Sequence, residues 1–112
     1  MFNEKYSHGK KFDFDSTNLE YIDLKEYVEQ GKTNPFKVMA MFTYEAQYGT
    51  RPVIVSEQYN IVCPNHIVKD VTSIMNNAEE VAAVNSGKCG FKAETYKDKN
   101  GVTRYSGQFC DI

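Results

Sequence analysis

The stretch AETYKDKNGVTRYSGQF, Ala93 to Phe109, predicts a β-hairpin near the end of the sequence. Asn100-Gly101 is a strong signal for a two-residue turn, because both central positions of that turn need a positive φ, which Asn and Gly tolerate. A turn at these two residues also fixes how the flanking strands pair. The pairs that follow are Lys99 with Val102, Lys97 with Arg104, Tyr96 with Tyr105, and Lys92 with Phe109.

This register makes the hairpin a candidate binding surface. It places Tyr96, Tyr105 and Phe109 on one face with Lys92 beside them, as in a platform on which bases stack. Cross-strand aromatic pairs also stabilise a hairpin without any ligand, so a purely structural role is the alternative. On the other face, Lys97 and Arg104 stand directly opposite each other. Like charges in this position are destabilising unless an anion lies between them or both side chains turn into solvent.

The strands before the hairpin decide the fold class. FKVMAMFTYEAQYG, residues 36–49, alternates apolar and polar residues as a strand does. RPVIVSEQ (51–58) and YNIVC (59–63) continue it as an antiparallel meander. PNHIVKDVTSIMNNAEEVAAVNSGK (64–88) is helical, with a break near residues 76–77 where Asn77 can cap a second helix. NLEYIDLKEYVEQG (18–31) predicts a short helix before the first long strand, with a strand at the start of this stretch as the alternative.

Three strands, a helical connection and two strands are the order of an OB-fold, a five-stranded, partly open barrel. We therefore expect an OB-like barrel preceded by a short N-terminal helix. An α+β antiparallel sheet with helices on one face is the alternative. We expect one domain over residues 16–112 and a flexible arm over residues 1–15.

Composition places the chain among ordinary globular proteins. Of its 112 residues, 41% are hydrophobic and 25% are charged, which excludes disordered and collagen-like classes. No apolar run approaches the roughly 20 residues that span a bilayer, and the first residues lack a secretory signal. We therefore expect a cytoplasmic protein that does not bind membranes.

The residues that could carry a metal or catalysis form no motif. Cys63, Cys89 and Cys110 are too widely spaced for a zinc site, and His8 and His66 have no partner motif. Phosphate-binding, nucleophile-elbow and zinc-protease motifs are also missing. The sequence therefore predicts a protein without catalytic activity, metal or cofactor.

The charge is unevenly distributed along the chain. The formal net charge is -2, yet residues 88–112 hold five Lys or Arg against three Asp or Glu. An anionic ligand should therefore prefer the hairpin. The segment before the first long strand is acidic, with Glu20, Asp23, Glu26 and Glu29, and could meet the basic surface of a protein partner.

Three segments resemble the small OB-fold single-stranded DNA-binding proteins that phages and mobile elements of Gram-positive bacteria encode. They are FKVMAMFTYEAQYGTRPVIVS (36–56), VCPNHIVKDV (62–71) and GKCGFKAETYKDKNGVTRYSGQFCDI (87–112). The resemblance covers about two-thirds of the chain. It implies a role in DNA replication, strand binding by groove aromatics and lysines, and assembly into a homodimer or a higher homo-oligomer.

These observations predict a non-enzymatic protein that binds single-stranded DNA or RNA, DNA being the first choice. Bases would stack on aromatic rings while cations meet the phosphates. The alternative is an inhibitor or adaptor that binds a host or phage protein through its acidic surface, and a weaker one is a structural subunit of a particle. The candidate nucleic-acid-binding residues are Tyr96, Tyr105, Phe109, Lys92, Lys97, Lys99, Arg104, Tyr44, Tyr48 and Arg51.

Overall fold

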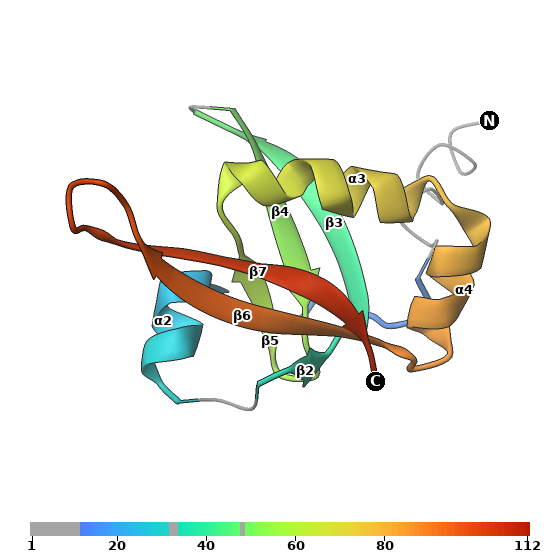
Figure 1. The fold of residues 1–112 in the computed structure, drawn as a ribbon. Coiled ribbons are helices and arrows are strands. Elements are labelled where there is room, and N and C mark those ends of the chain that lie inside the picture. The colour runs from blue at the N-terminus through green and yellow to red at the C-terminus, as the bar shows by residue number, and fades with distance from the viewer. Residues whose placement is uncertain (1–11, 32–33, 48) are drawn as a thin grey trace.

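The computed structural model of the chain describes residues 12–31, 34–47 and 49–112 (Figure 1). After a first strand and a short helix come four strands, three helical segments and two final strands. In chain order the elements are β1 (Glu20–Asp23), α2 (Leu24–Glu29), β2 (Phe36–Lys37), β3 (Ala40–Ala46), β4 (Gly49–Val55), β5 (Tyr59–Val62), the 3₁₀ helix η2 (Asn65–Ile67), α3 (Val68–Met75), α4 (Ala78–Asn85), β6 (Cys89–Lys97) and β7 (Thr103–Asp111).

The strands form two open sheets. One has the order β1-β5-β4-β3 and the other the order β2-β6-β7, and no closed barrel is found in the part of the chain that the structure describes. The predicted meander β3-β4-β5 is confirmed as antiparallel. The backbone passes from one sheet to the other at residues 38–39, where the amide of Val38 donates to Cys89 O and the amide of Met39 donates to Val55 O.

The predicted N-terminal helix is shorter than expected. Only Leu24–Glu29 is helical, and the residues before it, Glu20–Asp23, form a strand. This strand pairs in parallel with β5 and buries Ile22. A four-residue strand with one buried side chain depends on its neighbour in the sheet, and local sequence does not reveal that β5 is this neighbour. Since β1 occupies the outer side of β5, the edge of β7 is left without a second strand neighbour among the described residues.

The helical connection follows the prediction. It breaks at residues 76–77, and Asn77 caps α4 by accepting a hydrogen bond from the amide of Glu80 at 3.0 Å. Helix α3 packs over β3 and β4, and Val71 and Ile74 on its inner side are buried (Figure 1).

The predicted register of the hairpin is wrong by one residue. The amide of Gly101 donates to Asp98 O at 2.9 Å, and the amide of Asp98 donates to Val102 O at 3.0 Å. The loop therefore has three residues, 99–101, with Gly101 at φ +78°. Among the described residues, only glycines have a positive φ. A type I turn followed by a left-handed glycine is the usual form of such a loop. Its observed pairs are Lys97 with Thr103, Tyr96 with Arg104, Thr95 with Tyr105, Lys92 with Gln108 and Phe91 with Phe109.

The slip moves side chains to opposite faces, because side-chain direction alternates along a strand. Tyr96 no longer shares a face with Tyr105 and Phe109, so the predicted three-ring platform with Lys92 is not formed. The predicted like-charge pair is also absent, since the ammonium group of Lys97 donates to Thr103 Oγ1 at 2.9 Å instead of facing Arg104.

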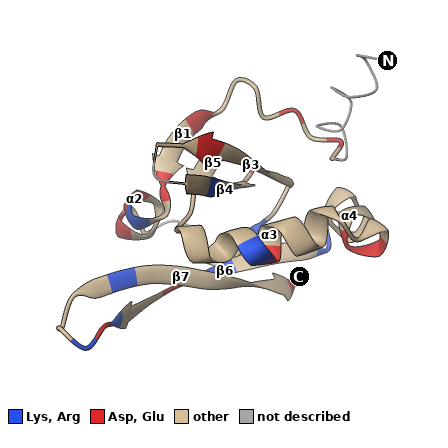
Figure 2. Cartoon of the chain, turned by 90° about the horizontal axis from the view of Figure 1, so that it is seen from above, with Lys and Arg blue, Asp and Glu red and all other residues tan. Residues whose placement is uncertain are grey.

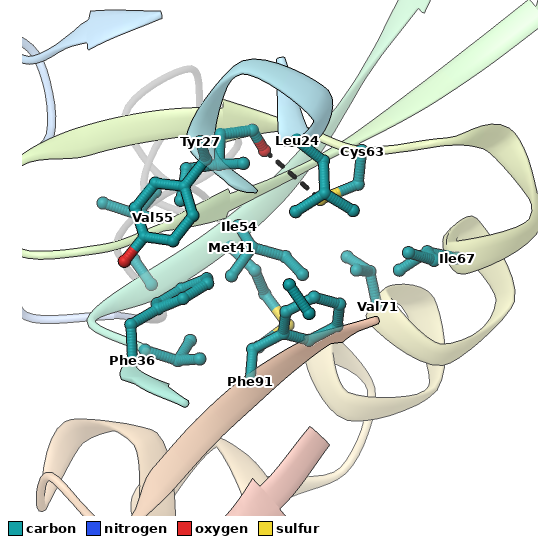
Figure 3. Close-up of a cluster of buried hydrophobic side chains, with 14 of the residues drawn as sticks. Leu24, Tyr27, Phe36, Met41, Ile54, Val55, Cys63, Ile67, Val71 and Phe91 are labelled. Carbon is teal, nitrogen blue, oxygen red and sulfur yellow. Dashed lines mark hydrogen bonds between the residues drawn. The ribbon is translucent and has the colours of Figure 1, made fainter. Parts of the chain in front are cut away.

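The core lies between the two sheets and beneath α2 and α3 (Figure 3). Phe91 from β6 is fully buried there, and its ring lies 5.7 Å from that of Phe36 and 5.1 Å from that of Phe109. Gly107 makes room for it: a Cβ at this position would come within 2.5 Å of the Phe91 ring. The core therefore fixes the base of the hairpin against the rest of the domain.

The expected arm, residues 1–15, lies mostly outside the described residues. Of the part that is described, Phe12 is buried in the core and the amide of Asp13 donates to Asn85 Oδ1 at 2.9 Å. Among the helices of the described chain, none has the length and apolar character required to cross a lipid bilayer.

Candidate nucleic-acid interface

A cleft of about 540 Å³ lies where the free edge of β7 faces the junction of β1 and α2. Strands β4, β5 and β6 and the 3₁₀ helix η2 complete its walls, so both sheets contribute to it. The cleft exists because β1, and not β7, pairs with the outer side of β5. Four of the ten predicted site residues line it, namely Arg51, Tyr96, Arg104 and Tyr105.

Arg51 comes to the cleft from β4. Its Nε donates to Cys63 O at 3.3 Å, which ties the side chain to the end of β5. Tyr44 stands directly opposite Arg51 on β3 and is 41% exposed, so it lies one strand away from the lining residues. Tyr48, the third predicted member of this group, lies outside the described residues. Tyr44 and Arg51 therefore lie on one continuous strand pair, as the sequence predicted.

The two tyrosines of the hairpin differ in burial. Tyr96 on β6 is half exposed, whereas Tyr105 on β7 is partly buried and packs against the core. Both nevertheless line the cleft, although their side chains leave opposite faces of the hairpin. Two-stranded ribbons twist strongly, and a twist of this kind can bring side chains of both faces to one side. An accessible ring and a fixed ring thus share one cleft.

Arg104 is the cation of the hairpin tip that reaches the cleft. Its Nε donates to Asp98 Oδ2 at 2.9 Å, and its side chain remains 57% exposed. The pKa of Asp98 is lowered, first by the backbone amide of Val102 and then by the hydrogen bond from Arg104. The carboxylate is therefore held in its charged form beside the guanidinium.

Sequence reasoning missed three titratable residues of the cleft. Asp23, Lys25 and His66 line it, and His66 Nε2 lies 2.8 Å from Ser106 Oγ on β7. The only signal for Asp23 and Lys25 was that the stretch 18–31 could also begin with a strand. His66 had no signal, because its place beside β7 depends on the tertiary fold.

The other predicted residues lie elsewhere. Phe109 packs against Phe91 in the core and lines a separate hollow beside Ile74 and Cys110. Lys92 is exposed opposite Gln108. Lys97 and Lys99 are exposed at the hairpin tip, close in sequence to the cleft but outside its lining.

The charge of the cleft is positive on balance. Its lining carries Lys25, Arg51 and Arg104 against the single carboxylate of Asp23. Figure 2 shows cations on the β6–β7 hairpin and carboxylates gathered on β1, α2 and α4. Glu20, Asp23, Glu26 and Glu29 are all exposed, so the acidic surface that the alternative hypothesis needs is accessible and stays a prediction.

The described residues offer no obvious metal centre. Over residues 12–31, 34–47 and 49–112, no three His, Cys, Asp or Glu side chains gather closely enough to hold an ion. The lining of the cleft presents aromatic rings and cations.

Comparison with protein family models, with curated proteins and with solved structures found no match to this chain.

Proposed function

We propose that the chain is a non-enzymatic protein that binds single-stranded nucleic acid, DNA in the first place, in the cleft between its two sheets. Bases stack on Tyr96 and Tyr105, and phosphates meet Arg51, Arg104 and Lys25. Tyr44 extends the path along β3. We also propose that the chain is a phage or mobile-element protein, the type that its sequence resembles, and that it assembles into a homo-oligomer.

The arrangement of strands supports an OB-like interpretation of the fold. The segment 36–46 pairs first with β6 and then with β4, so one bent strand belongs to both sheets. The meander, the helical connection and the final hairpin follow in the order of an OB-fold. We propose that this is an OB-like barrel opened along one seam, with β1 inserted at the outer side of β5.

One observation carries the functional proposal: a single cleft brings two aromatic rings together with three cations. Proteins that bind single strands without sequence preference combine a positive groove with rings on which bases stack. Every base has a flat face, so stacking tolerates any sequence, and each stacked base contributes roughly 1–3 kcal/mol. The half-exposed ring of Tyr96 is the accessible member of this pair.

Fluorescence polarisation with labelled oligo(dT) across a salt series tests the proposal. Phosphate contacts release counterions, so the logarithm of the binding constant should fall linearly with the logarithm of salt concentration. The double variant Arg51→Gln, Arg104→Gln should bind more weakly and lower the magnitude of this slope by about 1.4, since each contact with a single strand contributes about 0.7.

The matched control is Lys37→Gln, Lys88→Gln, which also removes two cations but at positions that do not line the cleft. It should leave the slope near that of the wild type. Failure of the wild type to bind oligo(dT) at low salt would contradict the proposal. A partner captured from host lysate after nuclease treatment would favour the protein-binding alternative.

A further inference from the structure

From the geometry of the hairpin tip we infer that Asp98 is a positioning residue, which orients the guanidinium of Arg104 toward a phosphate in the cleft. This inference rests on the proposed function. Asp98 does not line the cleft, whereas Arg104 does. The carboxylate would therefore act on binding only through the arginine.

The carboxylate of Asp98 is itself held firmly. Its Oδ1 accepts from the amide of Asn100 at 2.8 Å and from the amide of Val102 at 3.0 Å. Its own amide donates to Val102 O, and its own carbonyl accepts from Gly101. These bonds close the three-residue loop and leave Oδ2 pointing to a partner outside it. The loop thus presents one carboxylate oxygen in a fixed place.

Arg104 meets that oxygen side-on. It uses Nε, at 2.9 Å, and within the described residues its two terminal Nη groups make no hydrogen bond. Both groups thus keep their donors for a ligand, in the planar fork that suits a phosphate. A long exposed side chain otherwise loses rotamer freedom when it binds, and this loss weakens binding. Contact with Asp98 reduces that loss in advance.

The negative charge of Asp98, considered alone, predicts the opposite effect on affinity. A carboxylate next to a phosphate site repels the ligand, so its removal should tighten binding. Positioning predicts that its removal weakens binding. The sign of the change therefore separates the two effects.

The variant that tests this is Asp98→Asn. The amide oxygen of Asn can still accept from the two loop amides, as Asn does in many turns, so the loop is kept. The charged acceptor for Nε is lost. We expect oligo(dT), measured by fluorescence polarisation, to bind about 2- to 10-fold more weakly. Asp111→Asn is the matched control, because it removes one carboxylate from the far end of β7, and it should not weaken binding.

A double-mutant cycle shows whether the effect passes through the arginine. In an Arg104→Gln background, Asp98→Asn should cause no further loss of affinity. A loss that simply adds to that of Arg104→Gln would overturn the inference, as would unchanged or tighter binding by Asp98→Asn alone. Absence of binding by the wild type would refute the proposed function, and this inference with it. A wild type that binds while Asp98→Asn binds equally well would refute the inference alone.

Discussion

The two ends of the β6–β7 hairpin share one ladder of backbone hydrogen bonds but face different surroundings. At the base, Phe91 is fully buried and Gly107 lies against its ring. At the tip, Tyr96 is 50% exposed and Arg104 57% exposed, and the cleft lies beside them. The same two strands therefore hold the sheets together at one end and present rings and cations at the other.

This difference shows how one hairpin can serve both stability and binding. The base sets the register, because Phe91 and Phe109 must both face the core. The same register continues to the tip, where it determines the faces from which Tyr96 and Tyr105 project. Truncation of side chains at the base should change the free energy of unfolding, and truncation of side chains at the tip should change affinity.

The largest expected effect is that of Phe91→Ala. Truncation of a fully buried phenylalanine leaves a cavity, and we expect a loss of about 3–5 kcal/mol in the free energy of unfolding. Tyr96→Ala, on the same strand at the tip, should change this free energy by less than about 0.5 kcal/mol. Urea unfolding measures both. Equal losses for the two variants would remove the distinction between base and tip.

Gly107→Ala should come next. The added methyl group would meet the Phe91 ring at 2.5 Å and Lys92 O at 2.6 Å, and the backbone oxygen has little room to move. Overpacking of this kind costs about 1–3 kcal/mol. The same unfolding measurement detects it. A neutral result would mean that the Phe91 ring does not lie over Gly107 as closely as the structure shows.

Gly101→Ala is the corresponding substitution at the tip, where the expected loss of stability has a different cause. No atom lies within 4 Å of the added methyl group, but the residue sits at φ +78°. A left-handed conformation costs an L-residue about 1–2 kcal/mol. We expect a loss of this size with the core packing unchanged, visible as near-wild-type amide protection around Phe91. Loss of that protection would show that the loop, and not the core, sets the register.

The smallest effect should be a pH dependence at the tip. Because the folded-state pKa of Asp98 is lowered, its contribution to stability is present above the unfolded value of about 3.9 and is lost as pH falls through the folded value. The stability difference between the wild type and Asp98→Asn should therefore shrink below about pH 4. Thermal unfolding at neutral and acid pH measures it. A constant difference would mean that the charge of Asp98 plays no part.

The turn shows why the sequence predicted the hairpin but not its register. Asp98-Lys99-Asn100-Gly101 fits two patterns, Asn-Gly in a two-residue turn and Asp at the first position of a type I turn with Gly at its fourth. The side chain of Asp98 bonds two loop amides and so favours the second pattern. The pairing of Phe91 with Phe109 also favours it, since both then face the core.

The cleft was harder to predict because it depends on contacts distant in sequence. Arg51, Tyr96, Arg104 and Tyr105 were recognised as candidates from residue type and strand position. Lys25 was missed, since it reaches the cleft only when residues 20–23 pair with β5, about forty positions later. Local patterns identify the elements, whereas the open seam between the sheets is a property of how they pair.

The most direct test of the account is a titration of ¹⁵N-labelled protein with oligo(dT) at low salt, followed by backbone amide shifts. The account predicts that Lys25, Arg51, Tyr96 and Arg104 shift together, while Lys88 and Asp111 at the base of the hairpin do not. An absence of shifts, or shifts confined to the base or to the acidic face of α2, would contradict it.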